Sequence, residues 1–409
     1  MSSRPRLLVF NQYYWPGVEA TAHLLSELCA ALADEFQITV VTGMVGHVAG
    51  GASSNPGRSR NNGVEILRVR STAFDRRRLT LRGVNYLTYL AQSLVGGLRA
   101  DPPDVVLCMT DPPVIGDVAL LVARRFGVPL AVVSQDVFPE IAVELKRLEN
   151  PVLVSLLHHA IRFYLHRADR VVAIGETMRR RLEEKGADGG RLRVIPNWVD
   201  TGALTPQPKD NEWAREHGLA GKFVVMHSGN VGHAQNLDAL VRAATFLRDL
   251  PDLAIVIVGE GARRAELVEL AERLETEAVR FLPYQPRELL PQSLSAADVH
   301  VVGLARGLAG YVVPSRLYGV LSVGRPVIVA ADRESETAKV IEGARCGLVV
   351  RPGRPELLAA AIRRAYGGEL DLDAMGARAR AYVTAAADRE VAIARYRELL
   401  HELTDRRTA

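Results

Sequence analysis

The feature that most constrains this chain is the alternation of short apolar runs, rich in β-branched residues, with longer segments of helical periodicity. Short apolar runs bounded by turn residues predict buried strands, and a 3.6-residue spacing of apolar positions predicts helices. Because the two alternate, we predict an α/β fold with parallel sheets covered on both faces. In the first half, strands are expected at 7–10, 38–42, 64–70, 105–109, 130–134, 171–174 and 192–195, and helices at 21–34, 83–99, 118–126, 151–166 and 176–185.

The alternation is interrupted once, by the polar and turn-rich residues 196–222, which we interpret as a linker. The sequence therefore predicts two tandem Rossmann-like, doubly wound domains, 1–199 and 200–385. Residues 388–403 form a further periodic segment with no place in the second sheet, so the helix within 386–409 is expected to return to the first domain. In the second half, strands are expected at 223–227, 253–258, 279–282, 299–302, 327–329 and 348–350, and helices at 236–247, 262–274, 314–323, 337–342 and 355–366.

The composition fits a globular protein. At about 150 residues per domain, 409 residues predict two or three domains. The longest apolar stretches, such as 128–133 and 152–157, are far shorter than the ~18 residues of a membrane span, and the first residues lack the layout of a signal peptide. Three isolated cysteines (Cys29, Cys108 and Cys346) form neither a disulfide framework nor a metal motif. We expect a soluble, cytoplasmic protein that holds no metal.

The net charge of +4 is small for this length and argues against a general nucleic-acid partner. Its distribution is uneven, because one window holds Arg58, Arg60, Arg68, Arg70, Arg76, Arg77, Arg78 and Arg82. Two interpretations are open: a solvated loop, or a surface for the phosphates of lipids or of an anionic substrate. The window leads into an apolar and aromatic helix at 84–98. This edge could rest on the anionic inner face of a membrane and receive a lipid-linked acceptor, or the helix could belong to the core.

Three motifs in the second half follow predicted strands, where open parallel sheets bind ligands. Residues 228–232 (Ser-Gly-Asn-Val-Gly) suit either a phosphate or a plain turn. Glu260 and its two flanking glycines form either a plain turn or a turn that contacts a ligand. Pro314 is expected to start a helix, with Ser315, Arg316 and Leu317 in its first turn. We favour a phosphate-binding role for Arg316 over that of an ordinary surface arginine. No G-x-x-x-x-G-K-[ST] motif occurs, which argues against ATPase or GTPase chemistry.

Two motifs in the first half also lie at strand ends. The aromatic residues 13–15, which precede Gly17, either cap a ligand site or pack on their neighbours. Asp136 and Glu140 place two carboxylates after a buried strand, where they could bind sugar hydroxyls or support a developing charge. Alternatively, Asp136 caps a helix whose first turn holds Pro139 and Glu140. His158, His159, His166 and His227 are expected to be packed or exposed rather than metal ligands.

Together these motifs resemble the GT-B glycosyltransferases of family 4, which retain the anomeric configuration and use nucleotide-sugars. The resemblance covers nearly the whole chain. It is carried by Tyr-Tyr-Trp-Pro at 13–16, Asp-Val-Phe-Pro-Glu at 136–140, Ile-Pro-Asn-Trp-Val-Asp at 195–200, His-Ser-Gly-Asn-Val-Gly at 227–232, Val-Gly-Glu-Gly at 258–261 and Pro-Ser-Arg-Leu at 314–317, with Gly-Arg-Pro-Val at 324–327. The Asp-x-x-Pro-Glu element is similar to that of members that build cell-surface polysaccharides and lipid-linked sugars.

The resemblance implies two domains facing a central cleft, with the second domain binding the donor. Gly229 and Asn230 would lie near the donor diphosphate, Ser315, Arg316 and Leu317 near the diphosphate and ribose, and Tyr284 and Gln285 near the base. Asp136 and the loop around Gly17 would face the donor sugar and acceptor, which makes Asp136 and Arg316 the candidate catalytic residues. The implied donor is a UDP-sugar or another NDP-sugar, used without a metal or other cofactor.

The chain departs from the family pattern at two places. The pair of glutamates found in many members is replaced by Tyr311 and Gly319, and the cations that usually follow the Gly-rich loop are replaced by His-Ala-Gln at 233–235. Besides a glycosyltransferase, two alternatives therefore stay open. One is a GT-B sugar-nucleotide epimerase, which needs no acceptor, and the other is a catalytically silent partner subunit.

Overall fold

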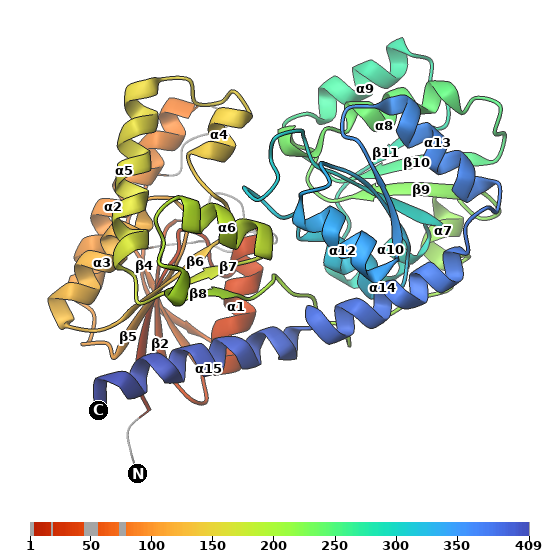
Figure 1. Ribbon diagram of the computed structural model, residues 1–409. Helices are drawn as coiled ribbons and strands as arrows, with labels where there is room; N and C mark the ends of the chain where they lie inside the picture. The colour runs from red at the N-terminus through yellow and green to blue at the C-terminus, as the bar shows by residue number, and fades with distance from the viewer. Residues whose placement is uncertain (1–3, 18, 45–55, 73–78, 409) are drawn as a thin grey trace. The chain divides into compact units, whose positions relative to one another are not determined.

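The computed structural model describes residues 4–17, 19–44, 56–72 and 79–408, which form two compact units. Unit 1 comprises the chain up to Pro196 together with Ala392–Ala409, and unit 2 comprises Asn197–Val391. Each unit is built around one sheet with helices on its faces (Figure 1). The predicted fold class, two tandem α/β domains with parallel sheets, is confirmed.

The sheet of unit 1 has eight strands in the order β3-β4-β2-β1-β5-β6-β7-β8, all parallel except β3, which pairs with β4 antiparallel. Every residue of β5, β6 and β7 is buried, because helices cover both faces of a parallel sheet. The strands are β1 (Arg6–Phe10), β2 (Gln37–Thr42), β3 (Gly57–Asn61), β4 (Val64–Arg68), β5 (Val105–Met109), β6 (Leu130–Ser134), β7 (Arg170–Ala173) and β8 (Leu192–Val194).

The helices of unit 1 include a group on one face of the sheet, where α2 and α5 both pack against α3 (Figure 1). The set is α1 (Ala20–Leu32), α2 (Leu79–Leu98), α3 (Ile115–Phe126), α4 (Glu140–Glu144), α5 (Pro151–Arg167), α6 (Glu176–Glu184) and the 3-10 helix η1 (Gly189–Arg191). The C-terminal helix α15 (Arg389–Thr408) belongs to unit 1 from Ala392 onward. It is tied there by Glu35, whose carboxylate lies 2.6 Å from Arg397 Nε and 3.0 Å from His401 Nε2.

The sheet of unit 2 has six parallel strands in the order β11-β10-β9-β12-β13-β14. These are β9 (Phe223–Ser228), β10 (Leu253–Val258), β11 (Val279–Leu282), β12 (Val299–Gly303), β13 (Val327–Ala330) and β14 (Gly347–Val350). The helices are α7 (Glu212–Glu216), α8 (Asp238–Ala243), α9 (Arg264–Arg273), α10 (Leu290–Ser295), α11 (Arg316–Ser322), α12 (Glu336–Ala344), α13 (Pro355–Tyr366) and α14 (Leu372–Ala386), with 3-10 helices η2 (His233–Gln235), η3 (Ala244–Phe246) and η4 (Arg287–Leu289).

The interpretation of 196–222 as a linker is wrong. This stretch contains α7, and Trp213 on α7 is 1% exposed and packs in a core cluster of unit 2. The Trp213 indole Nε1 donates to Gln285 Oε1 at 2.8 Å, so the stretch is held by a buried hydrogen bond as well as by apolar contact. The polar composition of the stretch predicted a linker because few of its residues, such as Trp213, are apolar and buried.

The interpretation of the arginine window as a loop is also wrong in part. Arg58 and Arg60 lie on the edge strand β3, and the guanidinium of Arg58 forms an ion pair of 2.8 Å with Glu65. Arg68 is buried at the end of β4 and donates to the carbonyl oxygens of Gly43 (3.0 Å) and Trp15 (2.7 Å). Arg76, Arg77 and Arg78 lie outside the described residues. None of the helices in the described part of the chain has the length and apolarity to cross a bilayer.

Candidate functional site

The site in unit 2 is centred on Arg316, the first residue of α11. Its Nη1 lies 2.5 Å from Nε2 of His227, which is fully buried near the end of β9. His227 Nδ1 lies 3.2 Å from the carbonyl oxygen of Val301. A carbonyl can only accept, so Nδ1 carries the proton and Nε2 is left to accept from the guanidinium. Sequence reasoning missed this role of His227.

Electrostatics support the same assignment. Burial, and then the charge of Arg316, hold the pKa of His227 well below its usual range, so the imidazole is neutral at pH 7. Burial lowers the pKa of Arg316 to about 10, and the nearby Tyr284 opposes this shift. Arg316 therefore stays protonated at neutral pH, and no described carboxylate forms an ion pair with it. A partly buried cation in this state is well suited to bind an anion.

The glycines around Arg316 are required by close packing of two loops. Gly229 has φ +136°, and a Cβ there would lie 3.4 Å from Cζ of Arg316. A Cβ on Gly259 would lie 2.0 Å from the Gly229 carbonyl oxygen, and one on Gly261 would lie 2.3 Å from that of Val231. The loops are also joined by hydrogen bonds, including Gly229 N to Val258 O at 2.9 Å. The glycines flanking Glu260 thus support the Gly229 loop.

Other predicted donor residues take different positions. Asn230 is exposed beside Arg316, whose Nη1 donates to its carbonyl oxygen at 3.4 Å, and Tyr284 is 63% exposed at the end of β11. The Glu260 side chain is exposed, 3.5 Å from Nε of Arg264. Gln285 is buried, and its side-chain amide is bonded to Trp213 and to the Pro283 carbonyl, so the side chain is engaged within unit 2 and its expected place near the base stays a prediction.

The α11 region also differs in detail from expectation. The helix begins at Arg316 rather than at Pro314, with Ser315 as a partly exposed N-cap. Leu317 is fully buried, and its N–H donates to the Pro314 carbonyl at 3.2 Å, so its side chain serves the core. A Cβ on Gly319 would meet the side chains of Leu204 and Leu294, which places this position in apolar packing. The Gly229 loop leads into η2, and not directly into α8.

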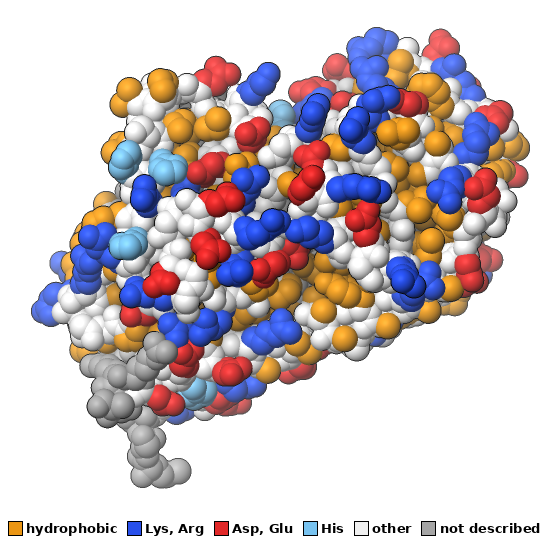
Figure 2. All heavy atoms as spheres, viewed as in Figure 1, with side chains coloured by type: hydrophobic (Ala, Val, Ile, Leu, Met, Phe, Trp, Pro, Cys, Tyr) orange, Lys and Arg blue, Asp and Glu red, His pale blue; other side chains and the backbone are white. Residues whose placement is uncertain are grey.

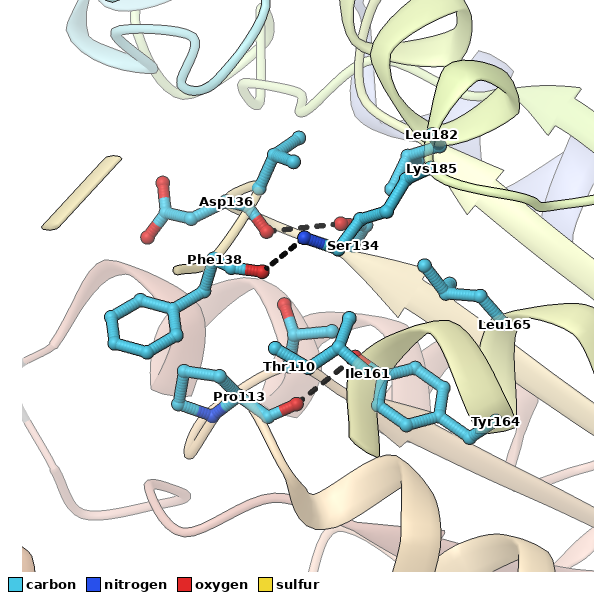
Figure 3. A pocket seen from close by; sticks show the side chains of 11 residues that line it. Thr110, Pro113, Ser134, Asp136, Phe138, Ile161, Tyr164, Leu165, Leu182 and Lys185 are labelled. Atoms are coloured by element: carbon cyan, nitrogen blue, oxygen red, sulfur yellow. Dashed lines mark hydrogen bonds between the residues drawn. The ribbon is translucent and has the colours of Figure 1, made fainter. Parts of the chain in front are cut away.

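In unit 1, the loop after β6 carries Asp136 on a well-held backbone. The hydroxyl of Ser134 donates to the Asp136 carbonyl at 3.1 Å, and Thr110 Oγ1 accepts from the N–H of Gln135 at 3.0 Å. The Asp136 side chain is exposed, and Figure 3 shows its carboxylate pointing away from the ammonium of Lys185. Capping of α4 by Asp136 is wrong, because Pro139 occupies the N-cap and no side chain caps that helix.

Lys185, which sequence reasoning missed, fixes the other end of this loop. Its side chain is 3% exposed, and Nζ lies 2.8 Å from the Phe138 carbonyl oxygen (Figure 3). Nζ also lies 2.6 Å from both carboxylate oxygens of Glu140. Burial lowers the pKa of Lys185, and the hydrogen bond to Glu140 opposes that shift. Glu140 is therefore engaged within the protein, and Asp136 is the carboxylate of this loop that faces solvent. Beneath the loop lies a cavity of about 10 Å³, bordered by Thr110.

The loop around Gly17 is tight and internally packed. Gly17 N donates to the Tyr14 carbonyl at 2.9 Å, and a Cβ on Gly17 would lie 2.9 Å from that oxygen. Tyr13 and Tyr14 are buried, which favours packing on neighbours for these two aromatics, whereas Trp15 is 44% exposed. Across the described ranges, no group of three or more His, Cys, Asp or Glu side chains is arranged to hold a metal ion.

The two tandem α/β units match the domain pattern of a known enzyme family. Two family models match the chain in tandem: "Glycosyl transferase 4-like domain" over residues 17–198 and "Glycosyl transferases group 1" over residues 190–382. The chain belongs to the family 4 type of glycosyltransferases with the GT-B fold.

Curated relatives are similar over part of the chain. WcaI of Escherichia coli, named for colanic acid biosynthesis and glycosyl transfer, is 32% identical over 49% of this chain and 50% of its own length. WbjE of Pseudomonas aeruginosa, named as a glycosyltransferase, is 28% identical over 68% of this chain and 69% of its own. D-inositol 3-phosphate glycosyltransferase of Nocardia farcinica is 36% identical over 53% and 49%. The chain thus spans about half the length of the first and third.

Solved structures share the fold over nearly the whole chain. HepE of Anabaena in complex with UDP superposes with a TM-score of 0.75 at 16% identity, covering 97% of this chain and 100% of that one. Sucrose-phosphate synthase of Thermosynechococcus elongatus gives a TM-score of 0.79 at 16% identity, covering 98% and 99%. At these identities the likeness shows the fold alone.

Proposed function

We propose that this protein transfers a sugar from a nucleoside diphosphate sugar, with a UDP-sugar favoured, to an acceptor hydroxyl with retention of anomeric configuration. The observation that carries the proposal is the Arg316 guanidinium, oriented by neutral His227 and adjacent to the side-chain-free backbone of Gly229. Complexes of the structural neighbour HepE with UDP and with UDP-glucose support a uridine donor.

Arg316 would serve as the charge that stabilises the leaving group. As the bond between the anomeric carbon and the diphosphate breaks, negative charge develops on the diphosphate oxygens, and a fixed guanidinium fork meets that charge. The new bond forms between the anomeric carbon and the acceptor oxygen on the same face, and the acceptor proton passes to the departing phosphate oxygen. This route requires no metal, because Arg316 and backbone N–H groups provide the positive charge.

Asp136 is the proposed catalytic residue of unit 1. It lies at the carboxyl end of β6, and the loop that carries it is held by Ser134, Thr110 and Lys185. A carboxylate on a rigid loop can bind sugar hydroxyls or favour positive charge on a reacting sugar. The name of WcaI, which refers to colanic acid biosynthesis, supports a cell-envelope or polysaccharide precursor as the acceptor. We propose that this acceptor is lipid-linked.

The proposed inner-membrane contact of the Arg58–Arg82 window now rests on fewer residues. Arg68 is buried and is not available to lipid phosphates, and Arg58, although exposed, is paired with Glu65. Arg70 and Arg60 are exposed and remain candidates. Vesicle binding that is unchanged when Arg76, Arg77 and Arg78 are replaced by Glu would overturn this part of the proposal.

The function is tested with purified protein and a panel of UDP-, GDP- and ADP-sugars, with and without an acceptor polysaccharide precursor. Acceptor-dependent release of nucleotide, with an α-linked product from an α-linked donor, supports retaining transfer. An epimerised nucleotide-sugar formed without acceptor indicates an epimerase. Absence of a thermal shift with UDP, GDP and ADP indicates a silent subunit, because a ligand at 100 times its Kd should stabilise by about 2.7 kcal/mol.

A further inference from the structure

We propose that the outward face of α5 docks on the surface of an anionic lipid bilayer. Four large apolar side chains of this helix are exposed: Val152 (76%), Leu156 (65%), Leu153 (42%) and Phe163 (42%). Val152, Leu156 and Phe163 are spaced by four and seven residues, so they form a single stripe along the helix. We call this stripe with Leu153 the α5 surface, and Figure 2 shows it as apolar side chains beside histidines.

The N-terminal part of the α5 surface is hollowed. An open apolar depression is lined by Val152, Leu156 and His159 together with Pro151 and Ser155. On the same side of the sheet, α3 exposes Leu121 (53%) and α2 exposes Leu87 (68%). Isolated surface leucines need no explanation, whereas several large apolar side chains exposed along one helix are typical of an interaction surface.

The charges on α5 itself favour an anionic partner. The 17 residues of α5 include no Asp or Glu, whereas Arg162 and Arg167 are exposed. The guanidinium of Arg167 lies 4.0 Å from the Phe163 ring centroid, and that of Arg124 on α3 lies 5.9 Å from it. Cations stacked on an exposed aromatic ring place positive charge at the level of lipid headgroups while the ring and the leucines enter the acyl boundary.

A second copy of the chain fits this surface less well than a bilayer does. In a two-fold dimer the same patch meets itself, so Arg162 and Arg167 of both copies would enter one interface to which α5 contributes no acidic side chain. The helix is about 25 Å long at 1.5 Å per residue, and it is not among helices apolar enough to cross the membrane. Lying flat at the interface satisfies both its apolar stripe and its basic side chains.

The test is flotation of the full chain with vesicles of 70% phosphatidylcholine and 30% phosphatidylglycerol, compared with pure phosphatidylcholine, without donor or acceptor. The wild type should bind the anionic vesicles, and its binding should weaken with added salt. Arg162→Gln/Arg167→Gln should weaken binding about 30-fold, at about 5-fold for each cation near an anionic surface. Leu156→Ser/Phe163→Ser should weaken it by at least ~10-fold, because apolar area no longer enters the bilayer.

A matched control comes from unit 2, where Phe246 is 51% exposed and Arg306 is also exposed. Phe246→Ser/Arg306→Gln should bind vesicles as the wild type does. Equal binding of neutral and anionic vesicles, or wild-type binding by both α5 variants, overturns the proposal. So does a wild-type dimer that Leu156→Ser/Phe163→Ser dissociates in sedimentation equilibrium while vesicle binding is unchanged. Thermal melting confirms that each variant is folded, and the result is independent of whether sugar transfer is observed.

Discussion

Replacing Lys185 with methionine should loosen the loop that carries Asp136 while preserving most of the side-chain volume. The substitution removes a buried ammonium with contacts of 2.6 Å to both Glu140 oxygens and 2.8 Å to the Phe138 carbonyl. Removing one partner of a buried ion pair costs about 3–5 kcal/mol. The Glu140 side chain is 26% exposed, so water can partly solvate the remaining charge and we expect a smaller loss, about 2–3 kcal/mol.

The assays are thermal unfolding and hydrogen exchange of the peptides that cover 134–148. A domain of this size should lose roughly 5–10 °C in Tm, and exchange in that segment should accelerate. Displacing Asp136 by even 1 Å should lower kcat by up to about 10²-fold. Lys146→Met, at an exposed lysine, is the matched control and should change none of these. In a double-mutant cycle with Glu140→Gln, a coupling energy near zero would refute the role assigned to Lys185.

Three further predictions concern unit 2. The pKa of His227 lies well below its usual value, and burial lowers the pKa of His300 to about 4, so only the unfolded state takes up these two protons as pH falls below about 6.5. The free energy of unfolding should therefore fall by up to about 2.7 kcal/mol per pH unit for the two histidines. In a series of denaturation curves at different pH values, His227→Gln should halve that slope. Gly259→Ala should destabilise by at least ~3 kcal/mol in urea unfolding, since its Cβ would lie 2.0 Å from the Gly229 carbonyl oxygen; a change below 1 kcal/mol would contradict the packing. Gln285→Leu should lower Tm without a selective rise in donor KM, because it removes the buried hydrogen bond to Trp213. A rise in donor KM at unchanged Tm would instead indicate that the Gln285 side chain contacts the donor base.

The strands could be predicted from the sequence because a buried parallel strand carries its own apolar signal. The expected strands 105–109 and 253–258 coincide with β5 and β10. β3 was missed because its sequence, Gly-Arg-Ser-Arg-Asn, is polar, and it is a strand only through pairing with β4. Trp213 was missed for a similar reason, since its burial depends on residues far away in the chain.

The site was predictable only where a local motif marks it. Gly229 and Arg316 were selected from glycine and Pro-Ser-Arg patterns, and the structure brings them together. The residues that hold the sites were not predictable, because His227 meets Arg316 across 89 residues and Lys185 meets Glu140 across 45. A histidine near the end of a buried strand is the one signal that could have indicated His227.

The central claim, that Arg316 stabilises the leaving diphosphate, is tested most directly by steady-state kinetics of Arg316→Ala with the donor that the panel identifies. Loss of one such stabiliser costs about 3 kcal/mol in the transition state, so kcat should fall at least 10²-fold while circular dichroism and Tm remain those of a folded protein. Arg316→Lys should recover only part of this loss, because an ammonium lacks the guanidinium fork. Wild-type kcat in folded Arg316→Ala would contradict the account.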